Sequence, residues 1–333
     1  MKVLITGISG LLGSNIARKL QERGYEVKGL LRKTSSLRSL EGVDFEKSYG
    51  VIQSAADVSR AVEGCDAVIH TAADTHHFTT AYLPAYEINL AGTVNVVEAV
   101  KRHQTKRLVY VSTVNVFGNG TLDKPGDETS AFGYQKNNSC YIQSKYQAHN
   151  FVTKEARENN LPAVILCPSF MLGPYDAKPS SGKIILLALN KPFNLTPPGG
   201  KNFVHVDDVA TAAVNALSMG RIGESYIVGN ENLSYSEFYR LVEEVSGRKI
   251  RNIRIPAGAL MGLGKSGEWI QKTFGIHNQL TVSNMSLLCA MHYYSSEKAV
   301  RELDFPQTPV KKAIADALEW FSQYDYLRKN KQK

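Results

Sequence analysis

The sequence is poor in the features that mark secreted, metal-binding or membrane-spanning proteins. Its 333 residues include only four cysteines, at positions 65, 140, 167 and 289, without a Cys-x-x-Cys pair. No histidine lies at metal-ligand spacing from them, so we predict reduced thiols and no metal site. No run of about 18 apolar residues is present, which predicts no membrane-spanning helix. The chain starts directly on the strand-like MKVLITG, so we expect no signal peptide and a cytoplasmic protein.

Acidic residues are the minority among the charged ones. Lys and Arg number 39 against 31 for Asp and Glu, a net charge of +8 that suits an anionic ligand. The one dense basic cluster, RKNKQK at the C-terminus, is predicted to be a solvated tail. Neither an RNA-binding signature nor a helix-turn-helix pattern is present, so we expect no nucleic-acid partner.

The order of apolar runs predicts the fold class. Short β-rich runs such as KVLITG (2–7) and RLVYVSTV (107–114) alternate with amphipathic stretches such as LLGSNIARKLQERG (11–24). This alternation is typical of an α/β protein of the Rossmann type, with a doubly wound parallel sheet and helices on both faces. From Asn230 to about 290 the sequence reads as mostly helical, with one strand predicted at 251–256.

The segment TGISGLLG, at residues 6–13, follows the first predicted strand and opens the first predicted helix. Gly7 permits a tight turn, Gly10 lets the backbone approach a diphosphate, and Gly13 lets the helix pack on the strand. The helix N-terminus adds N–H groups and the positive end of its dipole. The segment therefore predicts a dinucleotide-binding loop.

The end of the second predicted strand indicates which dinucleotide binds. Leu31 stands where an acidic residue would hold the ribose hydroxyls of NAD, and Arg32 and Lys33 follow it. A guanidinium suits the 2′-phosphate of NADP, so we expect NADPH, with NAD as the less favoured cofactor. The alternative is that Arg32 and Lys33 are only exposed.

These signals predict two lobes and a closing segment. The NADP-binding domain comprises residues 1–167 plus about 201–228, a smaller and mostly helical substrate lobe comprises about 168–200 plus 229–290, and a closing segment with a basic tail comprises 291–333.

Further motifs follow in a familiar order. They are CDAVIHTAA (65–73), INLAGT (88–93), VYVSTVNVFG (109–118), YIQSK (141–145), CPSFMLGP (167–174), NFVHVDDVA (202–210) and YSSEKAVRELDF (294–305). With the loop at 6–13 they make the chain resemble the extended short-chain dehydrogenase/reductase family, within the NAD-dependent epimerase/dehydratase superfamily. The nearest branch is the one that resembles dihydroflavonol 4-reductase and 3β-hydroxysteroid dehydrogenase.

The resemblance implies roles at matching positions. Tyr141 would be the general acid, and Lys145, one helical turn later, would lower its pKa and hold the nicotinamide ribose. Thr113 would be the catalytic hydroxyl, with Ser112 as the alternative. The family's cofactor contacts match the three glycines and Arg32, together with Leu11, Leu12, Thr71, Ala72, Ala73, Tyr141, Lys145 and Pro168.

The role of Asn89, which matches the family, and of His76 and His77, in an unusual stretch after the fourth predicted strand, stays open. Asn89 would hold a water or fix the backbone, and His76 and His77 would line the substrate cleft or be merely exposed. Gly50-Val51 replaces the usual Gly-Asp at the end of the third strand, so one adenine contact is lost or is made by the backbone.

The departures from the family favour a reductase. Val114 and Asn115 replace the Asp-Glu pair of the sugar-nucleotide dehydratases, and Cys167 replaces an arginine common in the epimerases. We therefore predict NADPH-dependent reduction of a ketone or aldehyde, or the reverse oxidation of an alcohol, on an apolar substrate by a possible homodimer. The alternatives are an NAD-dependent sugar-nucleotide epimerase and a non-catalytic NADPH-binding regulatory protein.

Overall fold

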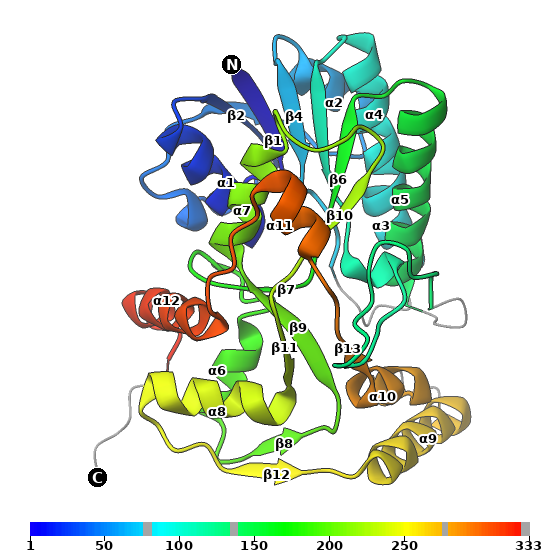
Figure 1. Cartoon of the computed structure of the whole chain (residues 1–333), viewed down its shortest axis with the longest axis vertical. Coiled ribbons are helices and arrows are strands. Elements are labelled where there is room, and N and C mark those ends of the chain that lie inside the picture. The colour runs from blue at the N-terminus through cyan, green and yellow to red at the C-terminus, as the bar shows by residue number, and fades with distance from the viewer. Residues whose placement is uncertain (76–81, 134–138, 275–278, 328–333) are drawn as a thin grey trace.

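The computed structural model describes residues 1–75, 82–133, 139–274 and 279–327 of the chain. A large sheet with helices on both sides occupies the upper part of Figure 1, and a smaller lobe lies below it. The last long helix, α12 (Val310–Gln323), packs against the smaller lobe.

The larger sheet has seven strands, and all neighbouring strands pair in parallel. Their order is β10 (Ser225–Val228), β6 (Ala163–Pro168), β5 (Arg107–Val111), β4 (Ala67–His70), β1 (Lys2–Thr6), β2 (Glu26–Leu31) and β3 (Glu46–Tyr49). The chain winds outward from β1 in one direction and from β4 in the other. The predicted Rossmann-type α/β fold is therefore confirmed.

Helices cover both faces of this sheet, because its strands bury side chains on both sides. In β1, Val3 and Ile5 join one apolar core, whereas Leu4 joins the other. The first core is covered by α1 (Leu11–Glu22), α7 (Val206–Asn215) and α11 (Glu297–Leu303), and the second by α2 (Ala55–Val62), α4 (Gly92–Arg102) and α5 (Cys140–Glu158). Burial on both faces explains why these strands read as continuous apolar runs.

The smaller lobe combines helices with two small sheets. Its helices besides α12 are α6 (Lys183–Asn190), α8 (Tyr235–Ser246), α9 (Ala257–Phe274) and α10 (Val282–Cys289). One sheet joins β9 (Gly200–His205) to β7 (Phe170–Leu172), β11 (Glu231–Ser234) and β13 (Met291–His292), and the other pairs β8 (Asn194–Thr196) with β12 (Asn252–Arg254). In the lobe's core, the rings of Phe203 and Phe238 stack 4.4 Å apart.

The helical character of the lobe agrees with the prediction, and β12 is the strand predicted at 251–256. The strands β7, β8, β11 and β13 were not predicted, since two to four residues carry too little periodicity to be recognised. β9 pairs within the lobe's sheet, whereas α7, which follows it directly, packs on α1. The division of the chain into domains by residue range stays a prediction.

The two lobes meet at the edge of the large sheet where the cofactor-binding and catalytic residues were predicted. The strands of the large sheet run downward in Figure 1, so that their carboxyl ends face the smaller lobe, and β6 leads directly into β7. Short elements lie at this edge or close to it: η1 (Arg38–Leu40), α3 (Tyr82–Tyr86), the π-helical η2 (Glu87–Ala91) and η3 (Val114–Val116).

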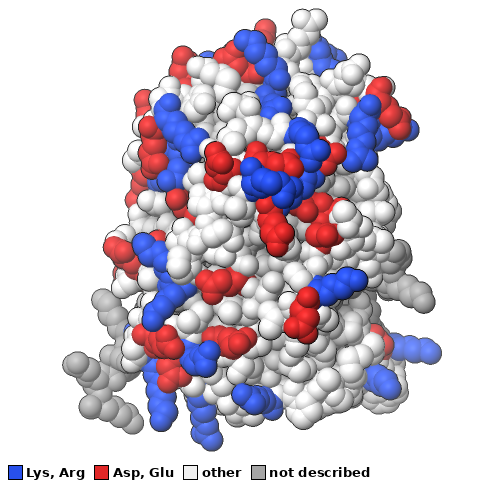
Figure 2. All heavy atoms as spheres, in the orientation of Figure 1, with Lys and Arg blue, Asp and Glu red and all other residues white. Residues whose placement is uncertain are grey.

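The surface charge of the face drawn in Figure 2 is mixed. Basic and acidic side chains are interspersed over the upper part of this face. Arg221 forms an ion pair with Glu302 of α11, and Lys298 of α11 forms one with Glu224. Among the described residues, no helix combines the length and the apolar character needed to cross a lipid bilayer.

Candidate active site

The loop that joins β1 to α1 has the geometry of an anion-binding turn. Gly7 adopts φ = +74°, and a Cβ on Gly13 would lie 2.3 Å from the Gly7 carbonyl oxygen. Only glycine therefore lets α1 begin this close to β1. Gly10 is the N-cap of α1 and offers no side-chain cap, and the first turn of the helix contains no acidic residue. The N–H groups of Leu11, Leu12 and Gly13 have no intrahelical acceptor and can bind a diphosphate.

The end of β2 presents a cation to the same edge. Leu31 is 2% exposed and completes the strand, whereas Arg32 is exposed and forms no ion pair with another described residue. An exposed guanidinium at this position can bind a 2′-phosphate.

A carboxylate lies at the end of β3 although the local sequence is Gly50-Val51. Oδ2 of Asp57, in the first turn of α2, accepts a hydrogen bond of 3.2 Å from the Val51 N–H. A Cβ on Gly50 would lie 2.6 Å from Asp57 Cβ, so the two residues are in contact. Asp57 could not be recognised from the local sequence, because it belongs to the next helix and its carboxylate extends back to the end of the strand.

Thr71, Ala72 and Ala73 follow β4 and lie beside the Gly7 turn. Thr71 Oγ1 donates a 2.7 Å hydrogen bond to the Thr6 carbonyl, and a Cβ on Gly7 would lie 2.8 Å from Ala72 N. The three residues are half-buried, so they form a wall beside the predicted phosphate loop.

Asn89 holds together three segments near this wall. It is 1% exposed, and its Oδ1 accepts a 2.8 Å hydrogen bond from the Asp74 N–H. Its Nδ2 donates to the Asp74 carbonyl and to Ser144 Oγ, both over 3.0 Å. Of the two roles left open, fixing the backbone is the one that these bonds perform.

The three predicted catalytic residues come together where β5 ends and α5 begins. Thr113 caps η3 directly after β5, and its hydroxyl is hydrogen-bonded to the Tyr141 phenol. Tyr141 and Lys145 lie one turn apart on α5 and are 8% and 2% exposed. Ser112 points elsewhere, because its Oγ lies 3.1 Å from Nδ1 of the buried His149. The structure thus brings Thr113, and not Ser112, to Tyr141.

The proton affinities of this pair differ from the expectation. Burial raises the pKa of the Tyr141 phenol, and the hydrogen bond with Thr113 opposes that shift. Lys145 Nζ donates instead to the Val111 carbonyl, over 2.8 Å, and to the Tyr110 hydroxyl, over 3.1 Å. Burial lowers the pKa of Lys145 to about 7. Burial therefore outweighs any lowering of the pKa of Tyr141 in this structure, and the effect expected of Lys145 on that pKa stays a prediction.

Pro168 ends β6 beside the carboxyl end of β5. It is buried, and Val228 of β10 pairs with it on the other side. Ser169 follows, and its buried hydroxyl has no hydrogen-bond partner among the described residues. This polar group lies at the start of the connection to the smaller lobe.

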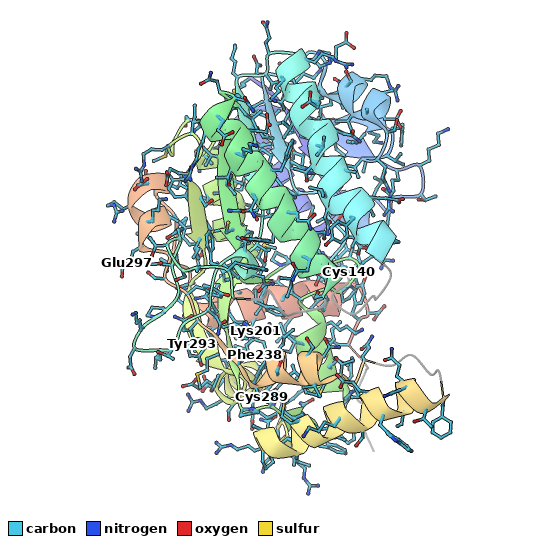
Figure 3. All side chains as sticks on the ribbon, turned by 90° about the vertical axis from the view of Figure 1, so that its right-hand side faces the viewer. Cys140, Lys201, Phe238, Cys289, Tyr293 and Glu297 are labelled. Atoms are coloured by element: carbon cyan, nitrogen blue, oxygen red, sulfur yellow. The ribbon has the colours of Figure 1, made fainter. Side chains whose placement is uncertain are left out.

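Apolar side chains surround Tyr141. Phe132 and Ile142 form a small cluster with it, and Leu287 of α10 packs against that cluster. In Figure 3, Cys140, the residue before Tyr141, marks the end of α5 that points toward the lobe. Leu287 could not be singled out from the sequence, since the region from 230 to 290 shows only a helical pattern.

Lys201 on β9 is a further cation in the smaller lobe that the sequence analysis did not single out. Its Nζ lies 5.2 Å from the centre of the Phe170 ring and forms no ion pair or hydrogen bond with another described residue. Burial lowers the pKa of Lys201 to about 8. The signal was present in the sequence, because Lys201 directly precedes the motif NFVHVDDVA.

Two predictions concern histidines and metals. His76 and His77 lie outside the described residues. Across the four described ranges, no three His, Cys, Asp or Glu side chains are grouped so that they could hold a metal ion.

Known proteins resemble the chain over nearly its whole length. The model of the NAD dependent epimerase/dehydratase family matches residues 3–229. A protein of Synechocystis sp. named as a dihydroflavonol 4-reductase is 28% identical, over 97% of this chain and 95% of that protein. A 3-beta-hydroxysteroid dehydrogenase of Mycolicibacterium neoaurum is also 28% identical, over 96% and 91%. The crystal structure of gox2253 covers 98% of this chain and 99% of its own, with 32% identity and a TM-score of 0.88.

Proposed function

Because the chain belongs to the NAD dependent epimerase/dehydratase family, it is an NAD(P)-dependent enzyme, and we propose that it reduces a ketone or an aldehyde with NADPH, or oxidises the corresponding alcohol. The proposal rests on one observation. The Thr113 hydroxyl and the Tyr141 phenol meet at the end of β5, with Lys145 one helical turn away. Two such hydroxyls can hold a carbonyl oxygen and give it a proton.

The residues present fit the cofactor. The Gly7 turn and the first N–H groups of α1 would hold the diphosphate, and Arg32 would hold the 2′-phosphate. A side chain larger than hydrogen on Gly7 would fill the space next to Ala72, which supports a loop built for close approach. NADPH supplies the hydride when it is bound.

The protein's own contribution is the handling of one proton. Burial raises the pKa of Tyr141, so the phenol is protonated at neutral pH and ready to donate. The carbonyl oxygen accepts hydrogen bonds from Thr113 and Tyr141, and negative charge develops on it as the carbon is reduced. Tyr141 then transfers its proton to that oxygen, and the Lys145 ammonium stabilises the phenolate that remains.

The surroundings of Tyr141 support an apolar substrate, because Phe132, Ile142 and Leu287 pack around it. They give no support to a dehydratase. Val114 and Asn115 occupy the positions of the family's acid pair, so the elimination of water lacks its proton carriers there.

A second candidate is a sugar-nucleotide epimerase, which Lys201 favours. A half-buried cation without an acidic partner among the described residues suits an anionic group such as a diphosphate. The lowered pKa of Lys201 is what burial without an anion produces, and a bound anion would raise it.

The deciding experiment follows the absorbance of NADPH with a panel of flavonoid, steroid, 3-oxoacyl and small ketones. Oxidation of added NADPH by at least one apolar ketone is the expected result. Protein purified with tightly bound NAD, and active on a sugar nucleotide without added cofactor, would select the epimerase instead. Absence of hydride transfer across both sets of substrates would refute both and favour a regulatory protein.

A further inference from the structure

Lys145 is a buried cation that forms no ion pair with a carboxylate of the described residues. The titratable groups that face it are Tyr110 on β5, Cys167 on β6, His70 on β4, and Tyr141 and His149 on its own helix. Burial lowers the pKa of both histidines and raises that of Tyr110, Tyr141 and Cys167, so all five are neutral near pH 7. Within the part of the chain that the structure describes, the ammonium is therefore held by neutral hydrogen-bond acceptors, the Tyr110 hydroxyl and the Val111 carbonyl.

The acceptor Tyr110 belongs to a hydrogen-bond network that runs from Lys145 across β5 and β4 to Thr6 on β1. Lys145 Nζ donates to the Tyr110 hydroxyl over 3.1 Å, and that hydroxyl is hydrogen-bonded to the side chain of Thr93 on α4. Thr93 Oγ1 lies 3.0 Å from Nε2 of His70, and Nδ1 of His70 lies 2.6 Å from Thr6 Oγ1. All five residues of this hydrogen-bond network are at most 2% exposed.

The direction of each hydrogen bond in the chain follows from the number of protons available. The Thr93 hydroxyl donates its only proton to the Asn89 carbonyl, over 2.6 Å. Its oxygen is therefore an acceptor toward both Tyr110 and His70. His70 must then carry its proton on Nε2, and its Nδ1 accepts the proton of the Thr6 hydroxyl. Burial lowers the pKa of His70 to about 3, which agrees with a neutral ring.

The Tyr110 hydroxyl is also hydrogen-bonded to the Ser112 side chain. Because the Lys145 ammonium can only donate, the Tyr110 oxygen accepts from it, and Thr93 offers an acceptor for the proton of Tyr110. Hydroxyl groups that donate onward are also stronger acceptors, because hydrogen bonds in a chain polarise one another. We propose that Tyr110, Thr93 and His70 are positioning residues that orient the Lys145 ammonium and keep it charged beside Tyr141.

The proposal deepens the proposed reductase function, since it concerns how Lys145 serves Tyr141. If turnover needs the ammonium, activity is lost as the pH rises through the pKa of Lys145. Removing an acceptor from the chain lowers that pKa, so the loss begins at a lower pH.

The test compares two buried threonines. Thr93→Val keeps the shape of the side chain and removes the hydroxyl that links Tyr110 to His70. Thr105→Val is the matched control, since the Thr105 hydroxyl is buried at 4% exposure and has no hydrogen-bond partner among the described residues. Thr93→Ser restores the hydroxyl and serves as the rescue.

We expect Thr93→Val to move the alkaline limb of the kcat/KM profile down by about half to one pH unit, as loss of one hydrogen bond predicts. Thr105→Val and Thr93→Ser should keep the profile of the original protein. If the pH profile of kcat/KM is unchanged in Thr93→Val and only the Tm falls, the hydrogen-bond network contributes only to stability, and the proposal is overturned. If Thr93→Val does not fold, Tyr110→Phe provides the same test.

A second readout does not depend on turnover. NMR titration of 13C-labelled lysine, with the Lys145 signal identified by its loss in Lys145→Arg, measures the pKa directly. A lower pKa in Thr93→Val supports the proposal even if no substrate is found. An unchanged pKa refutes it, whereas failure of the reductase assay alone refutes only the proposed function.

Discussion

Tyr141 performs the proposed proton transfer through a single atom, its phenolic oxygen. Tyr141→Phe keeps the ring in its apolar cluster and removes the proton, so kcat/KM should fall by about 10²–10⁴-fold. The affinity for NADPH, measured by fluorescence titration, should not change.

Tyr146→Phe is the matched control for this variant. The Tyr146 ring stacks on Phe132 with centres 3.8 Å apart, and removing its hydroxyl should leave turnover intact. Retained activity in Tyr141→Phe, or an equal loss in both variants, would contradict the role given to Tyr141.

Arg32 is the residue on which the choice of cofactor depends. Arg32→Ser should weaken the binding of NADPH by about 10–100-fold, since a charge-assisted hydrogen bond to the 2′-phosphate is lost. Isothermal titration with NADH provides the internal control, because NADH has no 2′-phosphate and its affinity should hardly change. An original protein that prefers NADH would overturn the assignment.

Helix α1 depends on glycine where it passes the phosphate loop. In Gly13→Ala the new Cβ would lie 2.3 Å from the Gly7 carbonyl oxygen, so α1 must move away from β1. The free energy of unfolding should fall by about 1–3 kcal/mol, measured by urea denaturation. The binding of NADPH should weaken as well, because the N–H groups of α1 move with the helix.

Gly258→Ala in α9 is the matched control for this element. A Cβ at Gly258 meets nothing within 4 Å, and the residue lies in the first turn of the helix. This substitution should be neutral or stabilise the protein by up to about 1 kcal/mol. Equal stability of the two variants would show that the contact between α1 and the loop is not tight.

The protein as a whole should lose stability in mild acid. Burial lowers the pKa of His70 to about 3 and those of His149 and His292 to about 4, with nearby lysines adding to each shift. The unfolded chain binds a proton at each of these sites below about pH 6.5, whereas the folded protein does not. The free energy of unfolding should therefore decrease as the pH falls from 6.5 to 4, by up to about 1.4 kcal/mol per pH unit for each histidine.

Measurement of Tm across this range tests the prediction, and His149→Asn should flatten the slope by about a third, since it removes one of the three groups. The half-buried Glu128 and the buried Asp176 act in the opposite sense, because burial raises the pKa of their carboxyl groups. A stability that stays constant from pH 6.5 to 4 would mean that these histidines are not kept neutral.

The homodimer expected from the resemblance stays a prediction.

Relations between near neighbours in the chain could be determined from the sequence. The spacing of Gly7, Gly10 and Gly13 and the four-residue spacing of Tyr141 and Lys145 depend only on the geometry of a turn and of one helix. The alternation of buried strands with amphipathic helices likewise predicts a parallel sheet, since the crossovers must cover both faces. These features predicted the fold and the residues that the structure brings together at the edge of its sheet.

Only the tertiary structure decided which partner each side chain meets. Thr113 and Ser112 are adjacent in sequence, and the packing of β5 against α5 turned one toward Tyr141 and the other toward His149. Asp57 of α2 accepts a hydrogen bond at the end of β3. Lys145 donates a hydrogen bond to Tyr110, which lies on another element, β5. Such contacts join residues from separate segments, and their burial shifts pKa values in ways that no local spacing encodes.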